Sequence, residues 1–194
     1  FDAGDGLRVA NTTDKGKLAP SILCGKGART DERELAFEIG KHLAYLRPER
    51  FVTYALASVP KIESAFAAAL LAAGTPVPGD ASDDTKKLAT AVKKVVPASL
   101  LEQVASLAGK LGPRAGNGLV SSWRSATDLT ANRVGLILAN DLATAAKLVA
   151  TEASTTSHLP VKERLRELLA FAVSEPYFQV RRHLGLTVRA EATA

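Results

Sequence analysis

Four side chains early in the chain have the types and spacing that could do chemistry on one face of a helix. Glu34, Glu38, Lys41 and Tyr45 follow one another at steps of four, three and four residues, and such steps bring side chains to the same side of an α-helix. His42 lies four residues after Glu38, so one carboxylate and one imidazole could reach a common metal ion. Two ligands fall short of the three that a catalytic zinc site needs. The plainer interpretation is a solvated face on which Lys41 neutralises the two glutamates.

A helix from about residue 30 to residue 46 is predicted to carry these side chains. Thr30 offers an N-cap oxygen, and Asp31 and Glu32 place carboxylates in the first turn, where they complement the helix dipole. Apolar residues then recur at helical spacing until Pro48, which cannot continue a helix. This apolar stripe consists of Leu35, Ile39, Leu43 and Leu46. The stripe is predicted to be the apolar face of the helix.

Residues 31–45, with the sequence DERELAFEIGKHLAY, resemble the active-site helix of the gluzincin zinc metallopeptidases of the HtpX and Oma type. In that family a His-Glu-x-x-His motif follows a similar lead-in. Its two histidines bind one zinc ion and the glutamate between them activates water. On this alignment Lys41 and Tyr45 occupy the two histidine positions, and His42 occupies the glutamate position. The resemblance therefore implies that all three motif residues are replaced.

Residues 128–135, with the sequence DLTANRVG, resemble a second signature of the same family. There a glutamate supplies the third zinc ligand and the sequence ADRxG follows. Asp128 then stands at the ligand position, and Asn132 stands at the position of the usual aspartate. The ammonium group of Lys41 would repel a metal cation and cannot coordinate one while protonated. The resemblance thus implies a zincin-like fold with a degenerate metal site, no catalytic residues and no cofactor.

We expect residues 1–194 to form one globular domain that is mainly α-helical, with a small N-terminal β element. Residues 30–150 would form a peptidase-like helical core and residues 151–194 a set of C-terminal helices, in which residues 174–183 pack against the core. Proline and glycine breaks divide the chain into about eight or nine helices. The glycine-rich segment 112–118 is predicted to be a lid or a plain connector.

The first 29 residues contain many glycines and two short apolar runs, 7–10 and 21–24. These runs predict one or two short strands at the edge of the helical body. Cys24 is the only cysteine, so no internal disulfide can form. We expect a buried structural thiol, because nucleophilic use would need a neighbouring histidine or cation to lower the pKa of this cysteine.

Composition excludes several classes of protein. Of the 194 residues, 46% are hydrophobic and 23% are charged, as in ordinary globular domains rather than disordered chains. The apolar stretches fall short of the roughly 18 residues that a membrane span needs. The net charge of +5 permits attraction to an anionic partner, but no aromatic platform or recognised motif accompanies it, which disfavours nucleic acid. The chain lacks methionine and a secretory leader, so we expect it to be a piece of a longer protein. For its location in the cell, the cytoplasm is slightly favoured.

Three functions are compatible with these patterns. The leading hypothesis is a non-catalytic, metallopeptidase-like interaction or scaffolding domain with a protein partner; abundant alanine and arginine suggest a bacterial protein from a GC-rich genome. The first alternative is a divergent metal-dependent peptidase or hydrolase that uses Glu38, His42 and Asp128 in altered roles. The second alternative is a basic binding module for an anionic partner, whose affinity would fall steeply with salt.

Overall fold

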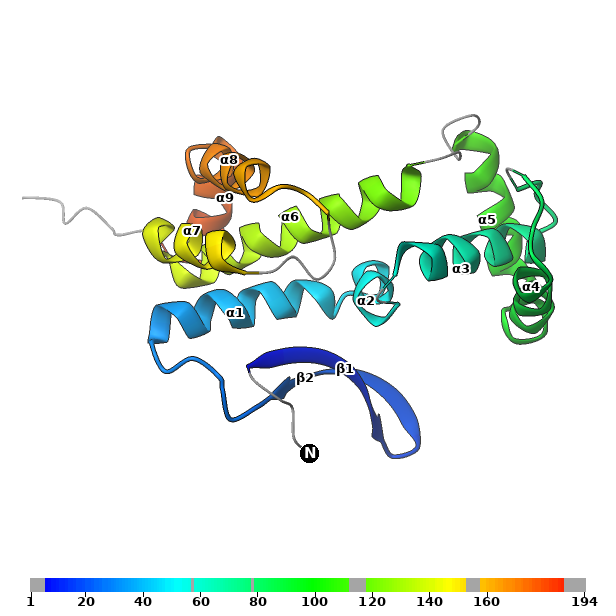
Figure 1. The fold of residues 1–194 in the computed structure, drawn as a ribbon, viewed down its shortest axis with the longest axis horizontal. Coiled ribbons are helices and arrows are strands. Elements are labelled where there is room, and N and C mark those ends of the chain that lie inside the picture. The colour runs from blue at the N-terminus through cyan, green and yellow to red at the C-terminus, as the bar shows by residue number, and fades with distance from the viewer. Residues whose placement is uncertain (1–5, 57, 78, 112–117, 153–157, 187–194) are drawn as a thin grey trace, which may run out of the picture. The chain divides into compact units, whose positions relative to one another are not determined.

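The computed structural model describes residues 6–56, 58–77, 79–111, 118–152 and 158–186. Together these residues form nine α-helices and one two-stranded antiparallel sheet (Figure 1). This arrangement confirms the predicted class, mainly α with a small N-terminal β element. In chain order the elements are β1 (Leu7–Asp14), β2 (Lys17–Cys24), α1 (Glu32–Tyr45), α2 (Pro48–Ala55), α3 (Val59–Ala72), α4 (Asp83–Val95), α5 (Ala98–Leu111), α6 (Leu119–Ala139), α7 (Leu142–Thr151), α8 (Val161–Ala172) and α9 (Glu175–His183).

The chain divides into two compact units. The first consists of Phe1–Ala55 and Ser125–Ala194, and the second is Leu56–Arg124. The first unit holds both strands, α1, α2, most of α6 and all of α7, α8 and α9; the second holds α3, α4 and α5. The prediction that all of the chain forms a single domain is not tested by this division and stays a prediction. Of the predicted lid or connector, only Gly118 lies within the described residues.

The two strands form a hairpin that pairs along its full length. Its turn consists of Lys15 and Gly16, both with positive φ, 47° and 78°. This is the backbone pattern of the two-residue turns whose twist matches that of antiparallel strands. Both strands have eight residues and are longer than the apolar runs that predicted them. The pairing extends through polar residues, which a search for apolar runs leaves out.

Cys24 corrects the prediction of a buried thiol. It is the last residue of β2 and its side chain is exposed. A two-stranded sheet gives the end of its strands little cover. The sequence pattern identified a strand at this position but not which side of it faces solvent.

Helix α1 begins one residue later than predicted, because Asp31 and not Thr30 is the N-cap. The carboxylate Oδ1 of Asp31 accepts hydrogen bonds from the backbone N–H groups of Arg33 and Glu34, at 3.0 and 2.9 Å. One carboxylate thus satisfies two of the amides that a helix start leaves unpaired. The corresponding cap of α4 is Ser82, whose hydroxyl accepts a hydrogen bond from the backbone N–H of Thr85 at 3.2 Å.

The buried face of α1 differs from the apolar stripe that the sequence suggested. Leu35, Ile39 and Leu46 are only partly buried and Leu43 is exposed. The face that packs inward consists of Phe37, Gly40, Lys41, Ala44 and Tyr45. It is rotated from the stripe and includes a lysine and a tyrosine.

A pair of glycines explains this choice of face. A Cβ atom added to Gly40 would lie 2.8 Å from the carbonyl oxygen of Val134, and one added to Gly135 would lie 2.8 Å from the ring of Phe37. Helices α1 and α6 therefore cross at a distance that only glycine permits at these two positions. The close crossing draws the neighbours of Gly40, including Lys41, into the interior.

Two apolar clusters surround this crossing in the first unit. The larger one joins Phe37 of α1 to side chains of α6, α7, α8 and α9. It includes Tyr177, which confirms that α9 packs against the core. The smaller cluster consists of Val9, Ala44, Tyr45 and Ala131 and holds the hairpin against the helices. In the second unit, the small side chains of Ala68, Ala72 and Ala89 form the buried contact. Within the described residues, no helix has the length and apolar character needed to cross a membrane.

Candidate functional site

A buried cluster of polar side chains lies where α1 crosses α6. Lys41 and Tyr45 come from α1 and Asp128 from α6, and all three side chains are almost fully buried. The hydroxyl of Tyr45 donates a hydrogen bond to Oδ1 of Asp128 at 3.1 Å, and Lys41 Nζ lies 3.7 Å from the same oxygen. Lys41 Nζ also donates a hydrogen bond to Oε2 of Glu152, the C-cap of α7. A buried ammonium is thus shared between two carboxylates.

Helix geometry explains why these side chains of α1 and α6 lie together. Lys41 and Tyr45 are four residues apart, so they lie on one side of α1. Asp128 lies seven residues before Gly135 on α6, two turns along the same side. The contact between Gly40 and Gly135 therefore also brings the polar residues together. The hydrogen bond and both ion pairs cross between segments that are far apart in the sequence.

Within the cluster, two carboxylates balance the positive charge of the Lys41 ammonium. Taking an ammonium and a carboxylate out of water costs several kcal/mol for each ion, and only close partners offset that cost. Here Lys41 has Asp128 and Glu152 as partners, and Asp128 has Lys41 and the hydroxyl of Tyr45. A metal ion at this position would have to displace the ammonium. The buried carboxylate of Asp128 is the counter-ion of Lys41 and is not exposed to solvent, where it could act as a base.

Asn132 lies one turn after Asp128 and is equally buried, 1% exposed. Neither its Oδ1 nor its Nδ2 has a hydrogen-bond partner in the described part of the chain. Buried side-chain amides in folded proteins are nearly always paired with protein or water. The amide of Asn132 is therefore an unsatisfied group beside the cluster.

His42 and Glu38 lie outside the buried cluster. The ring nitrogen Nδ1 of His42 lies 2.6 Å from the backbone carbonyl oxygen of Glu38, and the imidazole contacts the ring of Tyr54 edge-on. The carboxylate of Glu38 accepts a hydrogen bond from Arg29 Nε at 2.6 Å. Across the residues that the structure describes, no three His, Cys, Asp or Glu side chains are grouped to hold a metal ion. The structure thus brings Lys41, Tyr45 and Asp128 together, but not Glu38, His42 and Asp128 as a ligand set.

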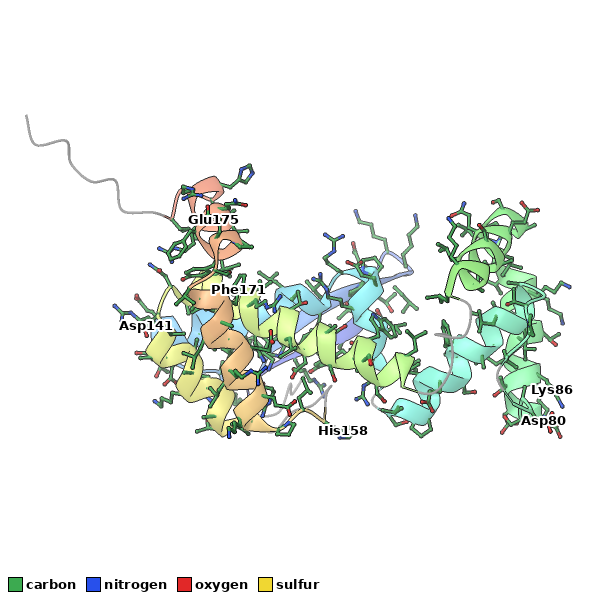
Figure 2. All side chains as sticks on the ribbon, turned by 90° about the horizontal axis from the view of Figure 1, so that it is seen from above. Asp80, Lys86, Asp141, His158, Phe171 and Glu175 are labelled. Atoms are coloured by element: carbon green, nitrogen blue, oxygen red, sulfur yellow. The ribbon has the colours of Figure 1, made fainter. Side chains whose placement is uncertain are left out.

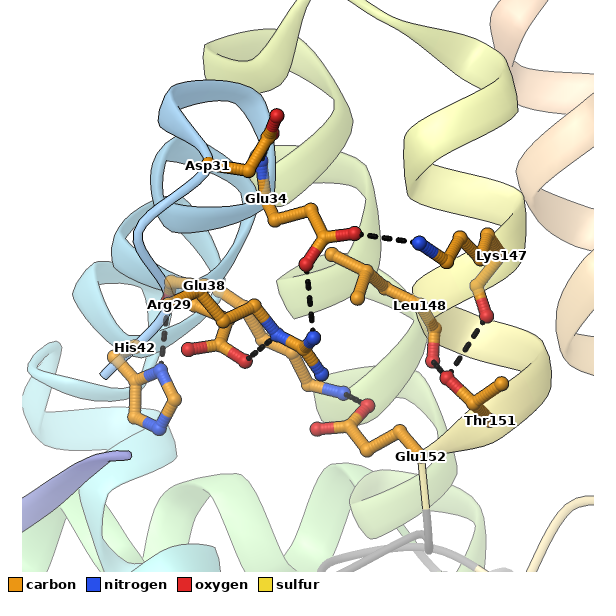
Figure 3. A network of polar contacts seen from close by, with 10 residues as sticks. Arg29, Asp31, Glu34, Glu38, His42, Lys147, Leu148, Thr151 and Glu152 are labelled. Atoms are coloured by element: carbon orange, nitrogen blue, oxygen red, sulfur yellow. Dashed lines mark hydrogen bonds and ion pairs between the residues drawn. The ribbon is translucent and has the colours of Figure 1, made fainter. Parts of the chain in front are cut away.

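A second polar network lies nearer the N-terminus of α1, on the side of the helix that also carries Lys41 (Figure 3). Arg29 Nη1 donates to Glu34 Oε2 at 2.8 Å, its Nε donates to Glu38, and Lys147 Nζ of α7 donates to Glu34 Oε1 at 2.8 Å. The hydrogen bonds from Lys147 and Arg29 lower the pKa of Glu34 below its ordinary value. The bond to Glu38 raises the pKa of Arg29. The interpretation in which Lys41 neutralises the two glutamates was wrong, because Arg29 and Lys147 do so.

Three residues of these two networks escaped the sequence analysis. Glu152 is 111 positions from Lys41, and Lys147 is 113 positions from Glu34. No spacing rule joins residues at such separations. A buried lysine requires carboxylate partners, but the sequence does not show which of 20 acidic residues supply them. Arg29 just precedes the helix, and its basic side chain was the one local signal available.

Comparison of the chain with known protein families, with curated proteins and with solved structures gave no match. The resemblance to gluzincin metallopeptidases therefore stays a prediction from two short segments. In the structure Lys41 and Tyr45 both contact Asp128. These are the three positions that the resemblance aligns with metal ligands.

Proposed function

We propose that this chain is a non-catalytic domain of metallopeptidase-like helical architecture that serves as an interaction or scaffolding module of a larger bacterial protein. The observation that carries the proposal is the buried ion pair of Lys41 with Asp128, to which Tyr45 also donates a hydrogen bond. An ammonium here supplies the positive charge that a metal ion would otherwise bring to Asp128. It does so without a vacant coordination position for water or substrate, which catalysis by zinc requires.

The alternative of a divergent hydrolase has less support. It needs Glu38, His42 and Asp128 to act together. Glu38 is bound by Arg29, and His42 Nδ1 is in contact with a carbonyl oxygen of its own helix. Asp128 is fully buried with Lys41.

Exposed apolar side chains near the C-terminal helices agree with the interaction role. Val173, the C-cap of α8, is 76% exposed, and Leu169 of α8 and Phe178 of α9 are nearly half exposed. Exposed apolar side chains mark a contact surface where they form a contiguous patch.

The test is the metal content and peptidase activity of the purified chain without a histidine tag. Elemental mass spectrometry is expected to find no stoichiometric zinc, and added zinc is expected to produce no hydrolysis of a denatured protein substrate. Near-stoichiometric zinc, or hydrolysis that a chelator abolishes, would overturn the proposal and revive the hydrolase alternative.

A variant in which the metal ligands of the motif are restored gives a stricter test. The variant Lys41→His/His42→Glu/Tyr45→His/Asp128→Glu restores the ligand types that the resemblance assigns to these positions. If the three positions keep a metal-site geometry, this variant should bind zinc. The matched control carries the same changes except that Asp128 becomes Asn, and it should bind zinc at least tenfold more weakly, because one of three ligands is absent. Equal zinc binding by both variants, or none by the rebuilt one, would count against the relationship.

A further inference from the structure

Helix α4 of the second unit carries the same short pattern twice on its exposed side. Two lysines and one apolar residue stand at 86–88, as Lys-Lys-Leu, and again at 93–95, as Lys-Lys-Val. The two triplets are seven residues apart, almost two full helical turns, so each residue of the first triplet lies in line with its counterpart in the second. The helix therefore carries two rows of lysines beside one row of apolar side chains.

The opposite side of α4 packs against α3. Thr85 and Ala89 are buried, and Thr85 Oγ1 lies 2.8 Å from Ser64 Oγ of α3. Ala89 shares an apolar cluster with Ala68 and Ala72. This contact fixes the orientation of the helix, because residues 85 and 89 are about one turn apart on the same side. All six residues of the two triplets are consequently exposed.

The apolar row of α4 lies in solvent. Leu88 is 40% exposed, and Val95 is 83% exposed, more than any other large apolar side chain in the described part of the chain. Exposed apolar residues are ordinary when they stand singly. This row runs alongside the lysines on one surface of one helix, and Ala91 between its two members is exposed as well. A partner that covers this side of α4 would remove the row from water.

The lysine rows carry charge that the described chain neutralises only in part. The two lysines of the first triplet lie 3.5 Å from Asp83 and Asp84, in exposed ion pairs of a kind that contributes little. Figure 2 labels Lys86, the first of them, among the side chains that point away from their helix. Within the described residues, Lys93 and Lys94 form no ion pair. The end of α4 is therefore a positively charged surface.

The surface of an anionic membrane complements both kinds of row. A helix that lies at a membrane surface has lysines on its polar side and apolar side chains that enter the headgroup region. Anionic headgroups attract lysines near the surface, and the long lysine stems keep the ammonium groups in water beside a buried apolar row. A carboxylate-rich peptide would complement the lysines alone. Nucleic acid is disfavoured, because proteins that hold it combine charge with aromatic side chains and α4 has none.

We propose that the exposed side of α4 binds the surface of an anionic lipid membrane. Leu88 and Val95 enter the headgroup region, and the lysines of both triplets contact the phosphate and carboxylate groups of the lipids. This surface belongs to the second unit. It does not depend on the proposed function, which rests on Lys41 and Asp128 of the first unit.

The test is co-sedimentation of the full chain with lipid vesicles at physiological ionic strength. We expect binding to vesicles of phosphatidylserine and phosphatidylcholine in equal parts, and none to vesicles of phosphatidylcholine alone. Lys93→Gln/Lys94→Gln should weaken binding about twenty-five-fold, or about fivefold for each lysine. The matched control, Lys17→Gln/Lys26→Gln, removes the same charge from exposed positions of the first unit. It should keep the affinity within about threefold, because charges outside the binding surface are largely screened.

Val95→Thr distinguishes a membrane from other anionic partners. It keeps the shape of the side chain and replaces a methyl group with a hydroxyl, so affinity for the mixed vesicles should fall about fivefold. All variants change exposed residues and should keep the melting temperature of the wild type, so a loss of binding does not come from unfolding. No binding to the mixed vesicles, or equal binding by the wild type and Lys93→Gln/Lys94→Gln, would overturn the site. A loss with the lysine variant but none with Val95→Thr, or binding of polyglutamate in place of vesicles, would overturn the membrane and indicate an acidic protein partner instead.

Discussion

Helix α1 is tied to α7 by two ion pairs at different levels along one side, and the two pairs obey different energetics. At the buried level, Lys41 is 3% exposed and reaches Glu152 while also facing Asp128. Two turns nearer the start of α1, Glu34 pairs with Lys147, which is 67% exposed (Figure 3). The contacts look alike in distance and chemistry. Their contributions to stability differ because of desolvation. An exposed pair contributes little to stability, whereas breaking a buried pair leaves a charge that water cannot reach.

The largest effect is expected from Lys41→Met. The substitution keeps the length and apolar stem of the side chain but removes the ammonium, leaving Asp128 charged and buried. We expect the free energy of unfolding to fall by about 3 kcal/mol, the lower end for a broken buried pair, because Glu152 remains one-third exposed. Urea unfolding followed by circular dichroism measures the change.

A double variant checks that the loss comes from the stranded charge. In Lys41→Met/Asp128→Asn the carboxylate becomes a neutral amide that can still accept the hydrogen bond from Tyr45. The double variant should be more stable than Lys41→Met alone, with a coupling energy of about 2 kcal/mol. If the two substitutions simply add, the buried pair is worth no more than a surface contact and the contrast between the two ion pairs fails.

The next effect tests why the inner face is the buried one. Gly40→Ala adds a Cβ atom that would lie 2.8 Å from Val134 O, a backbone atom that cannot move aside alone. We expect a loss of about 2 kcal/mol from overpacking, measured as a shift in the urea midpoint. The control is Gly109→Ala in α5, where an added Cβ has no atom within 4 Å. That change should stabilise the protein by about 0.5 kcal/mol through helix propensity. Destabilisation by both substitutions to the same extent would remove the close crossing as the cause.

The sequence showed α1 clearly but not which of its faces is buried. Its end was set by Pro48 and its start by the acidic first turn, both local signals. Four leucine and isoleucine residues suggested one face, yet the glycine contact with α6 selected another. A contact between two glycines leaves no local trace, because it depends on residues about a hundred positions apart.

The candidate site was predictable only in part. Lys41, Tyr45 and Asp128 were singled out through motif positions, and the structure brings them together. Nothing in the sequence pointed to Glu152 or to Arg164, whose Nη2 donates to the carbonyl oxygen of Glu152, because their contacts are made with residues that lie apart from them in the sequence. Asn132 was noted for its motif position, while its unsatisfied amide became visible only with the fold. Local patterns therefore identified residues, and the fold determined what each of them contacts.

A smaller effect is expected from Tyr45→Phe. The ring stays in its apolar cluster, and only the hydrogen bond from the hydroxyl to Asp128 is lost. We expect about 1 kcal/mol of destabilisation, the usual worth of one buried hydrogen bond. Tyr54→Phe is the matched control, because its ring packs 5.3 Å from that of Tyr45 and its side chain is only partly buried. A loss in the control as large as that in Tyr45→Phe would mean that the inner hydroxyl has no special role.

The smallest effect is expected from Glu34→Gln in the more exposed ion pair, and its pH and salt dependence completes the contrast. Hydrogen bonds from Lys147 and Arg29 lower the pKa of Glu34 in the folded chain. The stabilisation is therefore fully present above the ordinary pKa of an unfolded glutamate, and is lost as the pH falls through the lower pKa of the folded chain. The difference between wild type and Glu34→Gln in urea unfolding should vanish in that acidic range.

Salt should also reduce this difference, because charges exposed to solvent are screened. The loss caused by Lys41→Met should change little between low and high salt at neutral pH, because the buried pair is out of reach of the counter-ions. Unfolding of both variants at two ionic strengths therefore distinguishes the two ion pairs directly. Equal salt sensitivity would show that solvent reaches Lys41 and Asp128, and burial would then no longer distinguish this pair from the pair of Glu34 and Lys147.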